Sequence, residues 1–488
     1  MGQTSKRLDP STSSAARFGA ELRRFRTELG LSLAELGRSV HASGDLLGKI
    51  EKAERRPTVD LVDRLDESLG ARGDLVQLAH QLPNPIREAT KNALTSVRWA
   101  DRTRRQVNEI RIETPSGQFF RGTTMTALLH QGQERTGGIE LVLTDGHHDS
   151  VWDLRSSRLV LGALERRGRT RYFAVAAERV RRLPNLRAVV ELPWAYELDD
   201  FALGLLWAVT NLDDALLDDD AALAQRAAEL GMVEGARDVV DGSDDCLSHV
   251  STMWLGSSYC ARHILRNAES LSATPRYWTA ERSGEAASGW LLFRHKLEYL
   301  RRTAKIATGS TRPTRTFCLP PASIAALEPP DRILLLLAVA LVESFGIQVV
   351  ISVEDDLAEI PGFVLDRDGT AILANWINPD STWQVDVRRD QRTIREFATA
   401  TEHSVTNNLV RAELAMDRVR TLAEYLGIDW TWLRTRCAGF AAAGVADLVR
   451  PRSRLLSLAG VERACAFLAA ETSDASQAAG RNDGLPPD

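Results

Sequence analysis

Residues 31–58, LSLAELGRSVHASGDLLGKIEKAERRPT, constrain the fold most, because residues that start helices recur there at short intervals. Ser32 and Glu35 have the spacing of a capping box, in which the hydroxyl and the carboxylate each accept a backbone N–H. Ser43 is placed to cap the next helix and Thr58 the one after it. Several short helices joined by tight turns predict a compact all-α domain.

Apolar residues around these caps fall at helical spacing. The first helix is expected to bury Phe18, Leu22, Phe25 and Leu29, and Gly30 to end it in a left-handed turn. The predicted core face of the third and fourth helices consists of Leu47, Ile50, Val59, Leu61, Val62, Leu65 and Leu69. The domain is therefore predicted to span residues 17–82, after a flexible arm over residues 1–16.

The combination resembles the lambda-repressor-like (XRE family) helix-turn-helix domains of bacterial regulators. It is carried by Leu31, Ser32, Glu35, Leu36, Ser43, Leu47, Ile50, Glu51, Arg55, Arg56 and Pro57. The resemblance implies binding to double-stranded DNA, with residues 43–52 as the recognition helix. It also implies an ion pair between Arg26 and Glu51. The preference for Arg over Lys is typical of a GC-rich coding genome.

The expected reading surface is poor in side chains. The candidate DNA-binding residues are Ser32, Leu33, Ser43, Gly44, Asp45, Gly48, Lys49, Lys52, Arg55 and Arg56. Leu33 stands where the family usually has Gln, and His41 where its turn usually has Gly. The two glycines, four apart, would let the helix backbone approach the groove closely, while Asp45 and Lys49 could contact bases.

Charge adds little to this surface. Residues 1–82 hold 13 Lys and Arg against 12 Asp and Glu, a net of +1, within a chain of net charge −5. Modest affinity per module is expected, so we predict a homodimer that pairs two modules on a two-fold operator.

The rest of the chain predicts mixed structure. Residues 83–96 are a predicted linker, 97–240 a small α/β domain, 241–308 a helical region, 309–331 a proline-rich boundary or lid, 332–470 an α+β effector and dimerisation domain, and 471–488 a disordered tail.

Short β-rich runs at 139–145, 171–177 and 188–194 predict strands, with a helical block at 154–168 between the first two. Residues 201–302 look almost wholly helical. Later, 333–345 predicts a buried helix, 347–353 a strand and 362–377 a hairpin beside a strand at 382–387. The fold class is mainly α with α/β parts.

Candidate chemistry is sparse. The chain has no P-loop, no GxGxxG after a strand, no HExxH and no GxSxG, so we expect neither catalysis nor a cofactor. Two Cys-x-x-His pairs, Cys246, His249, Cys260 and His263, could hold zinc, but buried structural residues are the favoured interpretation and no metal is predicted. His147, His148 and Asp149 are interpreted as a polar loop. The acidic cluster of Asp213, Asp214 and Asp218 to Asp220 is interpreted as helix capping.

These observations favour a cytoplasmic transcriptional regulator with a small-molecule or protein effector and no membrane segment. Two alternatives remain. One is an enzyme or toxin-neutralising factor that uses the helix-turn-helix only for autoregulation. The other is a protein-interaction adaptor with a degenerate DNA-binding head.

Overall fold

The computed structural model of the 488-residue chain describes residues 14–71 except 41 and 53–58, then 73–75, 78 and 109–470. Within the last range it leaves out 143–157, 167–168, 183–188, 232–238, 242–246, 269–270, 272–273, 307–311, 367–368 and 376–381. The predicted linker and tail, and the arm up to residue 13, lie outside the described residues. The chain forms two compact units, residues 1–92 and 93–488, and each is described by itself.

The small unit is a helical bundle. Its helices are α1 (Ser14–Glu28), α2 (Leu33–Ser39), α3 (Gly44–Glu51) and α4 (Val59–Leu69). Phe18 and Leu22 of α1 pack with residues of the other helices, namely Leu36, Val40, Leu47, Ile50, Leu61, Val62, Leu65 and Leu69. The prediction for Leu29 is wrong, because α1 ends at Glu28 and leaves the Leu29 side chain 54% exposed. Gly30 follows with a φ of 68°, the predicted left-handed turn.

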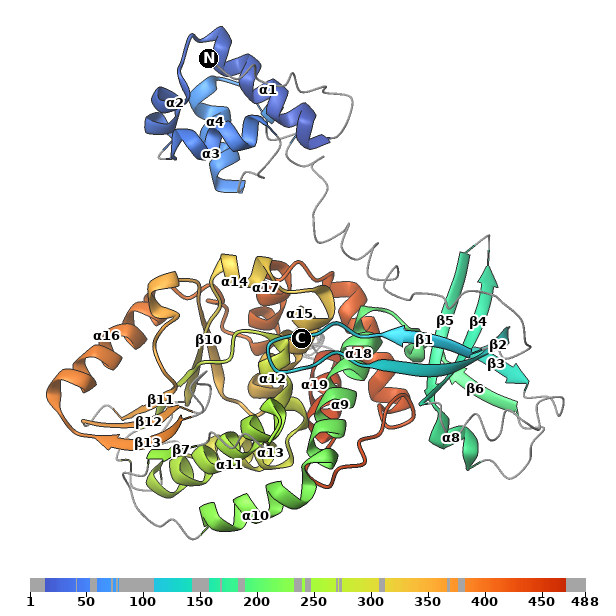
Figure 1. Ribbon diagram of the computed structural model, residues 1–488. Coiled ribbons are helices and arrows are strands. Elements are labelled where there is room, and N and C mark those ends of the chain that lie inside the picture. The colour runs from blue at the N-terminus through green and yellow to red at the C-terminus, as the bar shows by residue number, and fades with distance from the viewer. Residues whose placement is uncertain are drawn as a thin grey trace, which may run out of the picture. The chain divides into compact units, whose positions relative to one another are not determined.

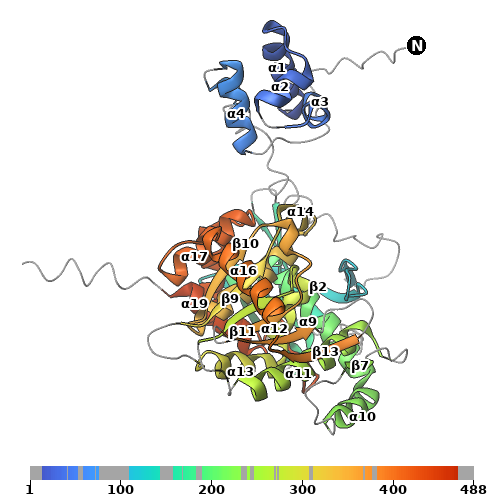
Figure 2. The ribbon, with the colours of Figure 1, turned by 90° about the vertical axis from the view of Figure 1, so that its left-hand side faces the viewer.

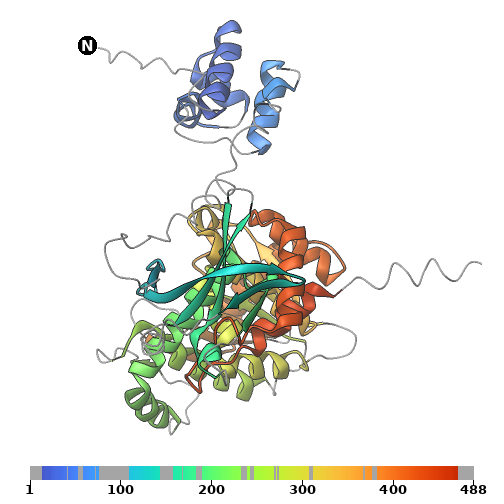
Figure 3. The ribbon, with the colours of Figure 1, turned by 90° about the vertical axis from the view of Figure 1, so that its right-hand side faces the viewer.

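The large unit begins with a six-stranded mixed sheet. Its strands are β1 (Glu109–Glu113), β2 (Thr124–Arg135), β3 (Gly138–Val142), β4 (Leu159–Arg166), β5 (Arg169–Ala176) and β6 (Val189–Pro193). They run in the order β5-β4-β2-β3-β6 with β1 paired to β2, and only β2 and β4 are parallel. Figure 3 looks onto this sheet. The prediction of a helix at 154–168 is wrong, since β4 lies within this range. A short apolar run does not by itself distinguish a buried strand from a buried helix.

A layer of helices follows between the two sheets of this unit (Figure 1). It contains α9 (Asp200–Asp218), α12 (Gly284–Leu292), α15 (Pro329–Ser344) and α19 (Ala459–Ala469). The predicted buried helix is confirmed in α15, whose residues from 331 to 343 are all buried. Around this layer lie α10 (Asp220–Gly231), α11 (His249–Ala268), α13 (Arg294–Thr303), α17 (Ala415–Tyr425) and α18 (Trp430–Ala443). Among the described residues, none of the helices is long and apolar enough to span a membrane.

The second sheet has seven strands, in the order β10-β9-β8-β11-β12-β13-β7. They are β7 (Val239–Asp241), β8 (Arg276–Thr279), β9 (Thr314–Cys318), β10 (Gln348–Ser352), β11 (Phe363–Asp366), β12 (Thr370–Asn375) and β13 (Thr382–Arg388). The predicted hairpin of β11 and β12 with β13 beside it is confirmed. One face of the sheet packs against α16 (Gln391–Thr406), as Figures 1 and 2 show, and α11 contacts β12 and β13.

Three strands of this sheet contradict the sequence prediction. Residues 201–302 are not almost wholly helical, because β7 and β8 lie inside them. The proline-rich segment 309–331 is not an irregular boundary or lid, because it contains β9, which pairs in parallel with both β8 and β10. The prolines stand outside the strand, and Pro321 and Pro329 open the short α14 (Pro321–Ala325) and α15.

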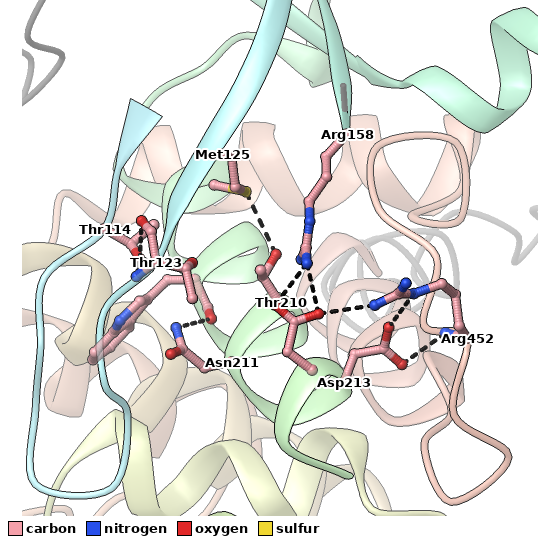
Figure 4. Close-up of polar contacts among 10 residues, drawn as sticks. Thr114, Thr123, Met125, Arg158, Thr210, Asn211, Asp213 and Arg452 are labelled. Carbon is pink, nitrogen blue, oxygen red and sulfur yellow. Dashed lines mark hydrogen bonds and ion pairs between the residues drawn. The ribbon is translucent and has the colours of Figure 1, made fainter. Parts of the chain in front are cut away.

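A polar network joins α9 to other parts of the large unit (Figure 4). The Asp213 carboxylate accepts hydrogen bonds from the backbone N–H groups of Arg452 and Ser453, both at 2.7 Å, and from Arg452 Nε at 2.9 Å. Asp214 accepts from Arg158 and Arg452. The capping interpretation of Asp213 and Asp214 is therefore wrong: both lie near the end of α9 and bind segments far away in the sequence.

Candidate nucleic-acid interface

The first turn of α2 is held by the predicted capping box. Glu35 N–H donates to Ser32 Oγ at 3.2 Å, and Ser32 N–H donates to Glu35 Oε2 at 2.8 Å. The hydrogen bonds from Ser32 hold the pKa of Glu35 below its usual value. The two hydrogen bonds satisfy backbone N–H groups that the first turn of a helix leaves without a partner.

The third helix has one buried and one exposed side. The Ser43 hydroxyl caps it by accepting the Leu46 N–H at 3.2 Å. Leu47 and Ile50 lie in the core of the small unit, whereas Ser43, Lys49 and Lys52 are exposed. The exposed side therefore presents one hydroxyl and two ammonium groups, which suit phosphate oxygens and base edges.

The buried end of α3 is fixed by an ion pair. Arg26 Nε lies 2.5 Å from Glu51 Oε1, and Arg26 Nη2 lies 3.0 Å from Glu51 Oε2. Arg26 Nη1 also donates to the Leu31 carbonyl oxygen at 2.7 Å. The hydrogen bond to Glu51 raises the pKa of Arg26. The Arg26–Glu51 pair that the resemblance implied is thus present, and it joins α1, the turn before α2 and the end of α3.

Sequence reasoning missed a second arginine at this carboxylate. Arg23 Nε lies 3.1 Å from Glu51 Oε2, and Glu51 is only 2% exposed. The available signal was spacing, since Arg23 and Arg26 are three residues apart and share one face of α1. Gly19 lies one turn earlier, where an added Cβ would stand 2.7 Å from the Glu51 carbonyl oxygen. Its lack of a side chain lets α1 cross close to the end of α3.

The two glycines of α3 face α2. A Cβ at Gly44 would lie 3.3 Å from the Leu33 backbone, and one at Gly48 would lie 3.4 Å from Leu33 Cδ1. Close packing of α2 on α3 therefore accounts for these glycines more directly than close approach to a groove. Leu33 itself is half-buried over Gly48, which explains how an apolar residue is accommodated there.

Some predicted contacts lie outside the described residues. These are Arg55, Arg56, the residue His41 in the turn and the side chain of Asp45. Their proposed roles at DNA stay predictions from the sequence.

The described residues of the possible zinc site do not come together. His249, Cys260 and His263 all lie on α11, and Cys246 and the 147–149 loop are outside the described residues. His249 precedes Cys260 by eleven residues, which is about 16 Å along a helix and too far for one ion. Cys260 and His263 are buried, and in the described part of the chain no three His, Cys, Asp or Glu side chains gather as metal ligands do.

Comparison with known proteins agrees with this geometry. A family model described as a helix-turn-helix domain matches residues 17–79. No curated protein and no solved structure matches the chain. The small unit is therefore a helix-turn-helix domain, a fold that indicates DNA binding.

Proposed function

We propose that this chain is a sequence-specific transcriptional regulator of the XRE kind that binds double-stranded DNA as a homodimer. The observation that carries the proposal is the orientation of α3. Its apolar side is locked into the core by Leu47, Ile50 and the Arg26–Glu51 pair, so its other side, with Lys49 and Lys52, is held rigidly toward solvent.

This geometry supports a division of labour in binding. Lysine contacts to phosphates supply affinity without sequence information. Ser43 and Asp45 at the start of α3, and Lys49 in its last turn, are the side chains proposed to reach base edges. With so few side chains contacting bases, one domain alone would have low sequence specificity. Pairing two domains on a two-fold operator would raise that specificity.

The large unit is proposed to dimerise and to bind an effector rather than to catalyse a reaction. Most of its described elements share one extended apolar core, and α16 packs on the second sheet through a separate apolar cluster. Such packing supports a rigid body able to hold two helix-turn-helix domains at a set spacing. An effector that binds one arrangement of the heads better than another would change operator affinity by shifting the population.

The test is a mobility-shift assay of the full chain on random-sequence DNA, followed by repeated selection of the bound fraction. We expect the bound pool to converge on a two-fold symmetric sequence with half-site centres about one helical turn, roughly 10 base pairs, apart. A protein that retards no DNA would contradict the proposal and favour the adaptor. Binding without convergence on any sequence would contradict the sequence-specific part of it.

A further inference from the structure

A second candidate site lies inside the large unit, between the second sheet and helices α11 to α13. It is a cavity of about 40 Å³. Its polar lining comes from β8, the residues just after β8, α13 and β9. It includes Tyr277, Glu281, Lys296, Tyr299 and Arg315. Arg315 and Lys296 against Glu281 give the cavity a formal net charge of +1.

Arg315 is buried and only partly satisfied. It stands on β9 in register with Tyr277 of β8, and 3% of its surface is exposed. Nη1 donates to Thr279 Oγ1 at 3.0 Å and Nη2 to the Tyr299 hydroxyl at 3.3 Å. The guanidinium carbon lies 4.6 Å from the centre of the Tyr277 ring and 4.7 Å from that of Trp290. These aromatic faces hold the cation in place, yet Nε finds no hydrogen-bond acceptor among the described residues.

Lys296, the second cation, pairs with Glu281, which is the only carboxylate among the described residues that line the cavity. Lys296 Nζ lies 3.7 Å from Glu281 Oε1 and 3.7 Å from the centre of the Trp290 ring. The same Glu281 oxygen accepts the Trp290 Nε1–H at 2.8 Å. Burial lowers the pKa of Lys296 to about 8, so the ammonium form still predominates at pH 7.

A further donor in the wall has no acceptor. Tyr277 is only 2% exposed, and its hydroxyl has no hydrogen-bond partner among the described residues. Buried donors without acceptors cost free energy, and proteins leave few of them. Both donors belong to residues that line the cavity, so an acceptor bound there would satisfy groups that the described protein atoms leave unpaired.

We propose that this cavity binds a small monocarboxylate of about the size of acetate, which accepts hydrogen bonds from Arg315 Nε and the Tyr277 hydroxyl. One negative charge balances the excess positive charge of the lining, and a planar carboxylate offers two acceptor oxygens to a guanidinium edge. The cavity exceeds the roughly 10–15 Å³ that one water molecule needs, so it admits an anion of a few heavy atoms or a few water molecules. It is too small for a sugar or a nucleotide. The proposal does not depend on DNA binding and goes beyond the function proposed above.

The test is isothermal titration of the full chain with sodium acetate at pH 7, with sodium chloride at equal ionic strength in both solutions. We expect saturable binding at one site per chain. Acetamide, which has nearly the shape of acetate without its charge, should bind at least about tenfold more weakly, because hydrogen bonds to a charged acceptor are the stronger ones. Absence of saturable acetate binding, as when water alone fills the cavity, would overturn the proposal, and so would equal affinity for acetamide.

Two variants locate the site. Tyr277→Phe removes an unpaired hydroxyl, so it should fold normally and bind acetate about tenfold more weakly. Tyr425→Phe is the matched control, because its hydroxyl donates to the Leu319 carbonyl oxygen at 2.7 Å and does not line the cavity. Tyr425→Phe should leave acetate affinity unchanged. Equal acetate affinity in wild type and Tyr277→Phe would overturn the assignment.

Discussion

Each unit of this protein buries a glutamate under arginine side chains, but the two pairs differ in how far they lie from solvent. In the small unit, Glu51 is buried while its partners Arg26 and Arg23 keep 14% and 33% of their side-chain surface exposed. In the large unit, Glu343 of α15 receives Arg418 of α17 at 2.7 Å through two nitrogens, and neither side chain exceeds 4% exposure.

The difference shows what each helix is able to do. The Arg26–Glu51 pair closes the end of α3, whose other side remains exposed and able to meet DNA. The Glu343–Arg418 pair joins α17 to α15, a helix buried along almost its whole length, and Glu343 also accepts the Val349 N–H. Under the proposed function, recognition by the small unit takes place on an exposed surface, whereas the charged groups buried in the large unit stabilise its fold or line an internal cavity.

The largest effect is expected from Glu343→Gln, which leaves the Arg418 charge buried without its counter-ion. The free energy of unfolding of the large unit should fall by about 3–5 kcal/mol. Tryptophan fluorescence during denaturant unfolding isolates this unit, because all eleven tryptophans lie beyond residue 92. Glu424→Gln, which breaks an exposed pair with Arg420 on the same helix α17, is the control and should change stability by under about 1 kcal/mol. Similar losses in both variants would contradict the account.

A pH-dependent effect of up to about 4 kcal/mol is expected from Asp200→Asn. Burial, with smaller repulsion from Asp199 and Glu328, raises the pKa of Asp200 from 3.8 to about 7. A raised carboxyl pKa means that the folded state holds the proton more tightly, so this group lowers stability as pH rises from about 4 to about 7. Asn at position 200 cannot ionise, so the free energy of unfolding of the variant should exceed that of wild type by a margin that grows from about pH 4 to about pH 7. The margin should be constant by about pH 8.

Asp390 is the control for Asp200, because its pKa is shifted in the opposite direction. The backbone hydrogen bond from Thr393 lowers the pKa of Asp390, which caps α16. Asp390→Asn should therefore lower stability at neutral pH, with the difference shrinking as pH falls below the ordinary aspartate range. Denaturant midpoints measured from about pH 2 to pH 8 test both variants. A constant difference between wild type and Asp200→Asn would refute the pKa assignment.

A smaller loss, about 2 kcal/mol, is expected from Glu51→Gln, because its arginine partners remain partly hydrated. Hydrogen exchange of the full chain should show backbone amides of α1 and α3 exchanging about 30-fold faster. Glu28→Gln, which disrupts an exposed pair with Arg24, should leave those rates nearly unchanged. If both variants exchange alike, Glu51 does not lock α3 to α1.

The smallest effect is expected from Gly48→Ala. Its added methyl meets only Leu33 Cδ1 at ordinary contact distance, so α3 should gain up to about 1 kcal/mol from helix propensity. DNA affinity should stay the same, since the position faces α2. Gly19→Ala is the counterpart and should destabilise the small unit, because its methyl would collide with the Glu51 carbonyl oxygen. A loss of DNA affinity in Gly48→Ala at unchanged stability would instead support close approach of the glycine face to the groove.

The small unit was largely predictable because its signals are local. Ser32 and Glu35 lie three residues apart, and Ser43 directly precedes the helix that it caps. The Arg26–Glu51 pair spans 25 residues and was reached through resemblance to a family rather than through spacing. Leu29 was misplaced because helical periodicity continues past the residue at which the backbone leaves the helix.

The large unit was less predictable because its partners are distant in the sequence. Asp213 binds Arg452, which lies 239 residues later, and nothing near Asp213 distinguishes it from a capping residue. Strand β9 lies among prolines, and its neighbour β8 is a four-residue run between helices. The register that brings Arg315 beside Tyr277 arises only when these strands pair, so the cavity had no sequence signature.

The central claim, that the exposed side of α3 contacts DNA, is tested most directly by the salt dependence of operator binding. For wild type, Lys52→Ala and Lys305→Ala, the logarithm of the binding constant is measured against the logarithm of salt concentration. Lys305 is an exposed lysine of the large unit and serves as the control. The account predicts weaker binding and a slope reduced by about one in Lys52→Ala, because one phosphate contact is lost. It predicts no change in Lys305→Ala. Identical slopes and affinities for all three proteins would contradict it.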